Sequence, residues 1–450
     1  MNSLSLRNAN LSEDPHFFGL LTRSYARLVG TALVPEGCGP EWLYHEAPFA
    51  VVAHNTETDP RFIYANEVAQ SVARISQGNQ SMKSSYLSAG LFRHWLLSAL
   101  LLGGVAHAGE AKPTAAPLPV RVVVVTTFEL GNDTGDKPGE LQSWVERFPL
   151  PQTIPFPQGY HTLRYNPEKQ VLGIVTGEGS LRGAASVMAL GLDPRFDLSK
   201  AYWLIPAIAG IDPTVASVGS AAWAEWVIDR DLNFEIDSRE IPSDWTTGHV
   251  PLGRSKPFQM PVPELDRYNG VNGYHLNAGL VDWAFHLTEH VKLEDTARLK
   301  AVRAGYPDYP NALKPPFVLK GDEVAASDWW LGEHMNTLAQ QWVTYWTKSK
   351  GRAVTTAMED AGILTSLSFL AQTHRVRLDR VLVLRTGSDY TIPAKGQTAA
   401  QLLASEASED DVLSAYLESL EAAYRVGSPV VNEIVNHWDR YGDVTPGSTR

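Results

Sequence analysis

The stretch QVLGIVTGEGSLRGAASVMALGL, residues 170–192, indicates the fold class of most of this chain. An apolar run, a glycine-containing turn and a run of small and apolar residues follow one another, which predicts a strand, a loop and a helix. RVVVVTTF (121–128) is a buried strand of β-branched residues, and AYWLIPAIAGI (201–211) is another apolar strand. Strands that alternate with helices predict an α/β layer structure with a largely parallel central sheet. Ligands of such sheets bind beyond the carboxyl ends of the strands.

Further elements follow along the chain. VLVLRTGSDY (381–390) predicts a strand that ends in polar residues, and residues 237–316 are loop-rich with a helix expected within 279–291. Three more segments predict helices: 328–349, 353–372 and 408–427.

The apolar stretch at 201–227 is long enough to suggest a membrane helix. Proline, glycine and acidic residues interrupt it, at Pro206, Gly210, Asp212, Pro213 and Glu225. We therefore expect two buried strands joined by a turn.

Residues 82–108, MKSSYLSAGLFRHWLLSALLLGGVAHA, have the pattern of a secretory signal inside the chain. Basic residues precede the apolar run at 95–105, and Ala106-His107-Ala108 has the small-x-small form of a cleavage site. We expect translation from Met82, a mature chain that begins near Gly109, and a periplasmic or secreted protein. The alternatives are a buried core helix and a retained membrane anchor, although the run is shorter than the roughly 20 residues of a membrane span. Translation from Met1 would leave the location open.

Residues 1–70 form a separate unit, followed by a polar linker at 71–81. Residues 17–30 have helical spacing of apolar residues, and 50–70 predict a strand, a turn and a strand. PEWLYHEAPFAVVAHN (40–55) and RFIYAN (61–66) resemble the opening of a PAS-like MEKHLA domain. The resemblance ends near Gln70, so we expect a truncated fragment; a small regulatory domain is the alternative.

Charge and cysteine content argue against a nucleic-acid ligand, disulfides and a cysteine metal site. The chain has 450 residues and a net charge of −12, which argues against nucleic acid as a ligand. The single cysteine, Cys38, precedes Met82, so the expected mature chain has neither a disulfide framework nor a cysteine metal site. We expect no metal and no tightly bound cofactor, apart from inorganic phosphate as a conceivable co-substrate.

Two glycine-containing turns follow predicted strands. Gly177 and Gly179 open a predicted helix, where backbone amides attract anions or sugar hydroxyls. Ala209 and Gly210 follow the next strand. Each turn, taken alone, is better explained as a structural connection.

Three acidic or aromatic segments complete the candidate site. Asp389 ends an apolar strand and suits a general acid if burial raises its pKa, or it caps the next turn. Glu359 begins a predicted helix, where it either answers the helix dipole or holds ribose hydroxyls. Asp328-Trp329-Trp330 offers aromatic faces for a planar base, although tryptophan is usually a core residue.

The order of these segments resembles the nucleoside phosphorylase and nucleosidase superfamily. The segments are the glycine loop, AGIDP with VGS, SDWW, MED and RTGSD. Residues 208–228, 235–253 and 385–399 are most similar to its purine nucleoside permease (NUP) branch. The resemblance covers 120–450 and implies a nucleoside phosphorylase-like three-layer fold with a central, largely parallel mixed sheet.

The resemblance also implies a role for each site residue. Asp389 corresponds to the acid that protonates purine N7, Ser388 orients it, and Arg385 lies near the nucleophile. Glu140 activates water, with Glu129 as the alternative. The substrate-binding positions are Met358, Glu359, Trp330, Asp328, Gly177, Gly179, Ala209 and Gly210, of which Glu359 and Met358 contact ribose and Trp330 stacks on the base.

Two departures from the superfamily pattern affect the expected reaction. Asp360 adds an acid after Glu359, and Ile208 replaces a serine. No arginine-rich phosphate pocket is evident, which favours hydrolysis of a purine nucleoside over phosphorolysis. The alternative is a permease-type role in which the chain binds adenosine or guanosine and delivers it to a membrane transporter. Relatives are usually dimers or larger, so a homo-oligomer is also an expectation.

Overall fold

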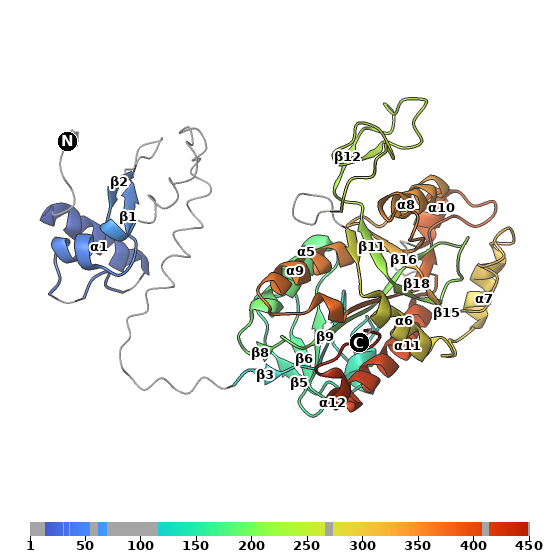
Figure 1. Cartoon of the computed structure of the whole chain (residues 1–450), viewed down its shortest axis with the longest axis horizontal. Coiled ribbons are helices and arrows are strands. Elements are labelled where there is room, and N and C mark those ends of the chain that lie inside the picture. Colours follow the sequence, from blue (N-terminus) through green and yellow to red (C-terminus); the bar gives the residue numbers. More distant parts are fainter. Residues whose placement is uncertain are drawn as a thin grey trace. The chain divides into compact units, whose positions relative to one another are not determined.

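The computed structural model describes residues 14–29, 31–35, 37–54, 62–69, 116–265, 273–406 and 414–448. The chain divides into two compact units, Met1–Thr114 and Ala115–Arg450 (Figure 1). The expected linker at 71–81 and the signal-like segment at 82–108 lie outside the described residues, so both remain expectations.

The first unit contains a helix and a strand pair, as the sequence predicts. Its elements are α1 (Pro15–Val29), the π-helical turn η1 (Trp42–Glu46), β1 (Val52–His54) and β2 (Phe62–Ala65), and the two strands are antiparallel. Asn66 follows β2 and is fully buried. Its side chain satisfies four backbone groups, those of Leu43, Phe49, Val51 and Ala69. One buried amide therefore ties the strand pair to the turn before it.

The second unit is built around one mixed sheet. The strands of the second unit, inside and outside this sheet, are β3 (Leu118–Pro119), β4 (Val122–Thr126), β5 (Gln152–Ile154), β6 (Leu163–Asn166), β7 (Val171–Val175), β8 (Phe196–Asp197), β9 (Tyr202–Ile211), β10 (Ala221–Ala224), β11 (Trp226–Asp229), β12 (Asn233–Glu235), β13 (His249–Pro251), β14 (Gly273–His275), β15 (Val318–Lys320), β16 (Asp322–Ala325), β17 (Ala353–Ala357) and β18 (Val381–Tyr390). Its helices are α4 (Gln142–Arg147), α5 (Ser180–Leu192), α6 (Ala278–Thr288), α7 (Ala297–Ala304), α8 (Glu333–Trp346), α9 (Asp360–Gln372), the 3₁₀ turn η2 (Leu378–Arg380), α10 (Ala399–Glu406), α11 (Tyr416–Asn436) and α12 (Trp438–Tyr441).

Strand β9 is the centre of the sheet. The order along the sheet is β14-β11-β16-β17-β9-β4-β7-β6-β5, and β18 pairs with β9 and with β10. Strands β7, β4, β9 and β18 are mutually parallel, whereas β17 runs antiparallel to β9. The α/β class with a mixed, centrally parallel sheet is therefore confirmed.

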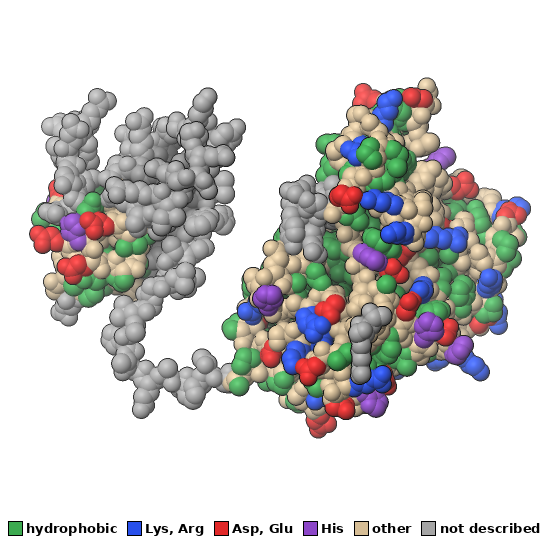
Figure 2. All heavy atoms as spheres, viewed as in Figure 1, with side chains coloured by type: hydrophobic (Ala, Val, Ile, Leu, Met, Phe, Trp, Pro, Cys, Tyr) green, Lys and Arg blue, Asp and Glu red, His purple; other side chains and the backbone are tan. Residues whose placement is uncertain are grey.

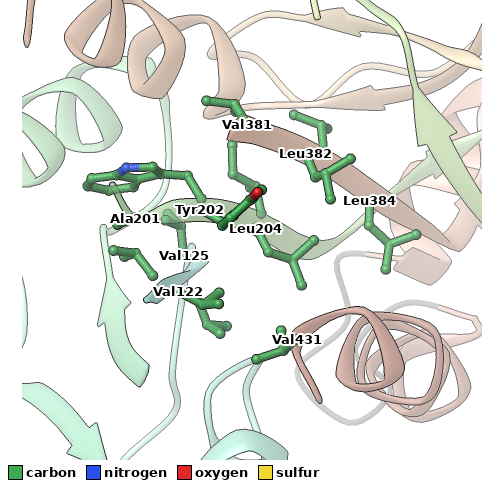
Figure 3. Close-up of a cluster of buried hydrophobic side chains, with 14 of the residues drawn as sticks. Val122, Val125, Ala201, Tyr202, Leu204, Val381, Leu382, Leu384 and Val431 are labelled. Atoms are coloured by element: carbon green, nitrogen blue, oxygen red, sulfur yellow. The ribbon is translucent and has the colours of Figure 1, made fainter. Parts of the chain in front are cut away.

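Apolar side chains from the parallel strands pack against α11. Figure 3 shows Val122 of β4, Leu204 of β9 and Leu384 of β18 gathered near Val431 of α11. Each of these side chains is almost completely buried. Burying such side chains stabilises the fold by about 1.5–3 kcal/mol apiece, so this cluster holds β9 and β18 rigidly where both lead into polar residues.

Helices α5 and α9 pack closely against each other. A Cβ atom on Gly362 of α9 would lie 1.9 Å from the carbonyl oxygen of Ser180, so only glycine permits this approach. The contact brings the start of α5, after the glycine loop, next to the start of α9, after Glu359.

Most predicted elements are present, including the two strands expected within 201–227 and the helix expected within 279–291. The helix expected over 353–372 is wrong in its first part, because Ala353–Ala357 is strand β17. The β-branched residues Val354, Thr355 and Thr356 favour a strand there. Helix α8 begins at Glu333 instead of residue 328, after Gly332 in a positive-φ conformation, and α11 continues past residue 427 to Asn436.

Candidate active site

One edge of β9 lacks a strand partner over a short interval. Strand β18 occupies the other edge throughout, while β4 pairs with Tyr202–Leu204 and β17 pairs with Gly210–Ile211. In the interval, the Ile208 amide donates to Glu140 Oε1 at 2.7 Å, and the Ile208 carbonyl accepts from Arg385 Nη1 at 2.9 Å. Two side chains thus take the place of a neighbouring strand, and space is left beside them.

A cavity of about 160 Å³ lies at this gap. It is lined by Thr127, Phe128, Glu178, Ile208, Ala209, Gly210, Trp329, Thr356, Ala357, Met358, Glu359, Ser388, Asp389 and Tyr416. Six of the residues predicted for the site are among them: Ala209, Gly210, Met358, Glu359, Ser388 and Asp389. A larger cavity of about 630 Å³ beside Tyr306 and Lys395 contains none of the predicted residues.

Asp389 lies at the end of β18 and is 1% exposed. Its Oδ1 accepts a hydrogen bond of 2.8 Å from Ser388 Oγ, while Oδ2 is buried without a hydrogen-bond partner among the described residues. Burial raises the pKa of Asp389 to about 7, and the Glu406 carboxylate acts in the same direction. The Ser388 hydroxyl and the Trp329 side chain lower this pKa by a smaller amount. A carboxyl group that is half protonated at neutral pH suits proton donation.

Glu140 is held on both of its oxygens. Oε2 accepts from the amide and the hydroxyl of Thr127, at 2.6 and 2.9 Å, and Oε1 accepts from Ile208. Burial raises the pKa of Glu140 to about 7, against the opposing effect of Arg385 and of the backbone donors. Glu140 lies behind Thr127 and Ile208 and does not itself line the cavity. The alternative Glu129 accepts backbone amides of Gly139 and Gln142 at the start of α4, which is a structural role.

Arg385 does not face the cavity, in contrast to its predicted place near a nucleophile. Its Nε donates to Asp360 Oδ2 at 2.7 Å, and its Nη2 donates to Glu359 Oε2 at 3.2 Å. The guanidinium is 1% exposed, and acidic side chains surround it. Its role is to hold Glu359 and the Ile208 carbonyl in place.

The glycine loop is joined to Glu359. Gly177 and Gly179 adopt φ values of 83° and 86°, which glycine tolerates without strain. The Gly179 amide donates to Glu359 Oε1 at 3.2 Å, and Glu178 between the two glycines lines the cavity. The Ser180 amide, at the start of α5, donates to Ser327 Oγ at 3.2 Å. The loop amides are thus already engaged by the protein.

The geometry corrects two predictions for the aromatic segment. Trp330, expected to stack on a base, is 6% exposed and belongs to a hydrophobic cluster with Trp342 and Trp346. The half-buried Trp329 lines the cavity instead. Asp328 is exposed and forms an ion pair with Arg230 outside the cavity. Helix α8 starts at Glu333, later than predicted, and Trp329 is the one of the two adjacent tryptophans that lines the cavity.

Several cavity residues are missing from the sequence-based prediction. Thr127 and Phe128 directly follow the strand β4, so the rule that ligands bind at carboxyl ends would have identified them. Tyr416 comes from the start of α11, which in the sequence is far from the end of any strand. Its hydroxyl donates to the Pro138 carbonyl at 2.7 Å. No local pattern marks Tyr416 as a site residue.

The sequence profile described as purine nucleoside permease (NUP) matches residues 119–446. This chain belongs to the NUP family. The profile of the MEKHLA domain matches residues 16–107 of this family member, a longer range than the one ending near Gln70 on which the resemblance rests.

Named relatives and solved structures accompany the family match. A probable purine nucleoside permease of Schizosaccharomyces pombe is 33% identical over 284 residues, 62% of this chain and 80% of the relative. A purine nucleoside permease of Candida albicans is 27% identical over 339 residues, 74% of this chain and 79% of the relative.

Two solved structures are similar to this NUP family member at low identity. Futalosine hydrolase of Helicobacter pylori has 12% identity and a TM-score of 0.41, and covers 70% of this chain and 98% of its own. The 5′-methylthioadenosine/S-adenosyl homocysteine nucleosidase of Campylobacter jejuni has 11% identity and a TM-score of 0.42, with 70% and 99% covered.

Two further findings concern the described residues, one on membrane-spanning helices and one on metal sites. Within them, no helix combines the length and the apolar character needed to cross a bilayer. The same residues contain no cluster of three or more histidine, cysteine or acidic side chains arranged to hold a metal ion.

Proposed function

We propose that this chain binds purine nucleosides and cleaves their N-glycosidic bond with water. The observation that carries the proposal is the buried carboxyl group of Asp389, at the cavity, with a pKa raised to about 7. An acid that retains its proton near neutral pH can protonate a leaving base. Membership of the NUP family and the names of its relatives support a purine nucleoside as the ligand.

In the proposed reaction, Asp389 donates its proton to N7 of the purine. The bond between C1′ and N9 then breaks, its electron pair stays with the base, and the base leaves as a neutral molecule. A water molecule adds to C1′ and passes its proton to Glu140 through the hydroxyl of Thr127, a residue that lines the cavity and whose Oγ1 lies 2.9 Å from Glu140 Oε2. Proton exchange with solvent restores both carboxyl groups.

Substrate orientation is assigned to two residues on either side of the cavity. Glu359 accepts hydrogen bonds from ribose hydroxyls, because it lines the cavity and is fixed by Gly179 and Arg385. Trp329 stacks on the base beside Asp389. Stacking of a base on an aromatic side chain is worth about 1–3 kcal/mol.

The charges around the cavity favour water over phosphate as the nucleophile. Glu178 and Glu359 line it beside the protonated Asp389, and the described lining residues include no lysine, arginine or histidine. The amides of Gly179 and Ser180 and the guanidinium of Arg385 already have protein partners. A phosphate anion would therefore meet repulsion without compensating donors, which also favours nucleosides over nucleotides as substrates.

The direct test incubates the full chain with adenosine and guanosine, with and without inorganic phosphate. We expect free base together with free ribose, at a rate that phosphate does not increase. Release that requires phosphate and yields ribose 1-phosphate would overturn hydrolysis. Binding in a calorimeter without any release of base would favour the second function below.

The second candidate function is delivery of nucleosides for uptake, which the names of the relatives favour. In this role the chain binds a nucleoside and hands it to a membrane transporter. It requires export, and we propose a periplasmic or secreted protein translated from Met82. Sequencing the N-terminus of the exported protein tests this: a start near Gly109 supports it, and a start at Met1 excludes it.

A further inference from the structure

Several buried acids share one guanidinium beneath the cavity. Asp360, Glu359 and Glu323 lie around Arg385, with Glu323 Oε2 3.6 Å from Arg385 Nε. Glu140 also acts on Arg385 through its charge. If all four acids were ionised, one positive charge would face four negative ones in a region shielded from water.

Glu323, like Asp360, is a group in this cluster that the proposed reaction does not use. It is 0% exposed, and both of its oxygens lack a hydrogen-bond partner among the described residues. Asp360 Oδ1 is likewise buried and unpartnered, while Asp360 Oδ2 accepts from Arg385 Nε. A carboxyl group without a hydrogen bond and a second one with a single unpartnered oxygen therefore flank the same nitrogen atom. An ionised carboxylate without hydrogen bonds is strongly unfavourable in such a place.

A single proton on Glu323 gives both Glu323 and Asp360 Oδ1 a hydrogen bond. A protonated carboxyl group is a donor, and an ionised one accepts. We propose that Glu323 is a protonated positioning residue that donates a hydrogen bond to Asp360 Oδ1, and so keeps Arg385 turned toward Glu359. This rests on the proposed function, because Glu359 is the ribose-binding residue of that site.

The surroundings of Glu323 support a proton in preference to a cation or a water-exposed charge. The charged groups that face it are Asp360 and Glu359 at the start of α9 and Arg385 on β18. Burial, and then the charge of Asp360, raise the pKa of Glu323 well above its ordinary value. Thr355, its register partner on β17, presents a buried hydroxyl that also has no hydrogen-bond partner within the part of the chain that the structure describes. Arg385 would repel a metal ion at this distance.

The test uses two substitutions and one control in the full chain. Glu323→Gln keeps the shape and a donor for Asp360, whereas Glu323→Leu removes the donor. Asp322→Asn is the control, because Asp322 is a buried acid on the same strand that accepts from the amides of Trp226 and Arg352 and lies outside the cluster. Unfolding temperatures from pH 5.5 to 8.5 and the Kd for adenosine and guanosine are measured for each protein.

The pH dependence follows from the sign of the linkage. Because its pKa is raised in the folded state, Glu323 contributes a loss of stability to the wild type as pH rises above the ordinary glutamate value, and Glu323→Gln lacks this contribution. We expect the unfolding temperature of Glu323→Gln, relative to the wild type, to increase by at least about 3 °C between pH 5.5 and 8.5. A difference that stays constant with pH would overturn the proposal, even if Glu323→Leu does not fold.

Nucleoside binding tests the positioning role. We expect Glu323→Gln to bind within about threefold of the wild type and Glu323→Leu to bind at least about tenfold more weakly, a loss of roughly 1.4 kcal/mol. Asp322→Asn should lower the unfolding temperature without this loss of affinity. Wild-type affinity in Glu323→Leu would exclude a positioning role. If the wild type bound no nucleoside, the proposed function would fail while the pH test of the proton remained decisive.

Discussion

Asp389→Asn separates the role of the acid from the shape of the site. Asparagine preserves the size of the side chain and a contact with Ser388, but it cannot donate a proton to the base. General acid catalysis contributes about 10²–10⁴-fold, or roughly 3–5 kcal/mol of barrier. We therefore expect turnover of adenosine to fall by that factor while Kd changes by less than about threefold. Base release and calorimetric binding measure the two quantities separately.

The same substitution has a calculable effect on stability. A pKa raised from 3.8 to about 7 corresponds to about 4 kcal/mol, the free energy by which the folded state disfavours the ionised form. Because the folded pKa is raised, the wild type loses this stability as pH rises from about 4 to about 7. Asp389→Asn does not titrate. Its stability relative to the wild type should therefore increase by up to about 4 kcal/mol between pH 4 and pH 8, measured by urea unfolding.

Two results would refute this reasoning. Turnover above a tenth of the wild-type value would show that Asp389 is not the acid, and a stability difference that is equal at both pH values would show that the pKa of Asp389 is not raised in the folded state. Ser388→Ala is the matched control. It removes the 2.8 Å hydrogen bond that stabilises the carboxylate and leaves the acid in place, so turnover should persist and its alkaline limb should move to higher pH.

Two further predictions concern the base and the aromatic contact. The pH–rate profile of the wild type should be bell-shaped with both limbs near pH 7, because Glu140 must be ionised and Asp389 protonated. Glu140→Gln should lower turnover about 10²–10⁴-fold and remove the acidic limb of this profile. Retention of that limb would exclude Glu140 as the base. Trp329→Ala should raise Kd by about 5- to 150-fold, from the loss of about 1–3 kcal/mol of stacking. Trp330→Ala should instead lower stability by about 3–5 kcal/mol in denaturant unfolding and leave Kd nearly unchanged, because Trp330 is a core residue; the opposite pattern would restore Trp330 as the stacking residue.

The sequence allows the sheet and the positions of its acids to be predicted, because both depend on local patterns. Strand β18 reads as VLVL followed by polar residues, and Asp389 lies at the cavity as expected at a strand's carboxyl end. Strand β17 was missed because Val354, Thr355 and Thr356 precede a good helix without an intervening turn residue. The helical period of the following segment outweighed the β-branched run in the prediction.

Long-range contacts could not be predicted from local patterns. Arg385 directly follows the apolar run VLVL within β18, where a site arginine is expected, but its partners Asp360 and Glu323 come from other elements. The choice between Trp329 and Trp330 depends on where α8 begins, and boundaries are set by packing as much as by sequence. Tyr416 reaches the cavity only because α11 packs across β9 and β18.

The interruption of the β9 edge explains why structure and chemistry depend on the same residues. A buried backbone group without a partner costs about 1–3 kcal/mol, so the gap at Ile208 is tolerable only because Glu140 and Arg385 satisfy its amide and carbonyl. Arg385 can reach Ile208 only if it is buried, and burial requires acids around it. Burial, and the charges of neighbouring acids, in turn raise the pKa values of Glu140 and Glu359, and the cluster holds Glu359 at the cavity. Loss of activity after a substitution in this cluster is therefore not by itself proof of a catalytic role. To assign a catalytic role, the pH dependence of stability must be measured, and Kd and turnover must be measured separately. Substitution of a purely structural partner would change neither result in the predicted direction.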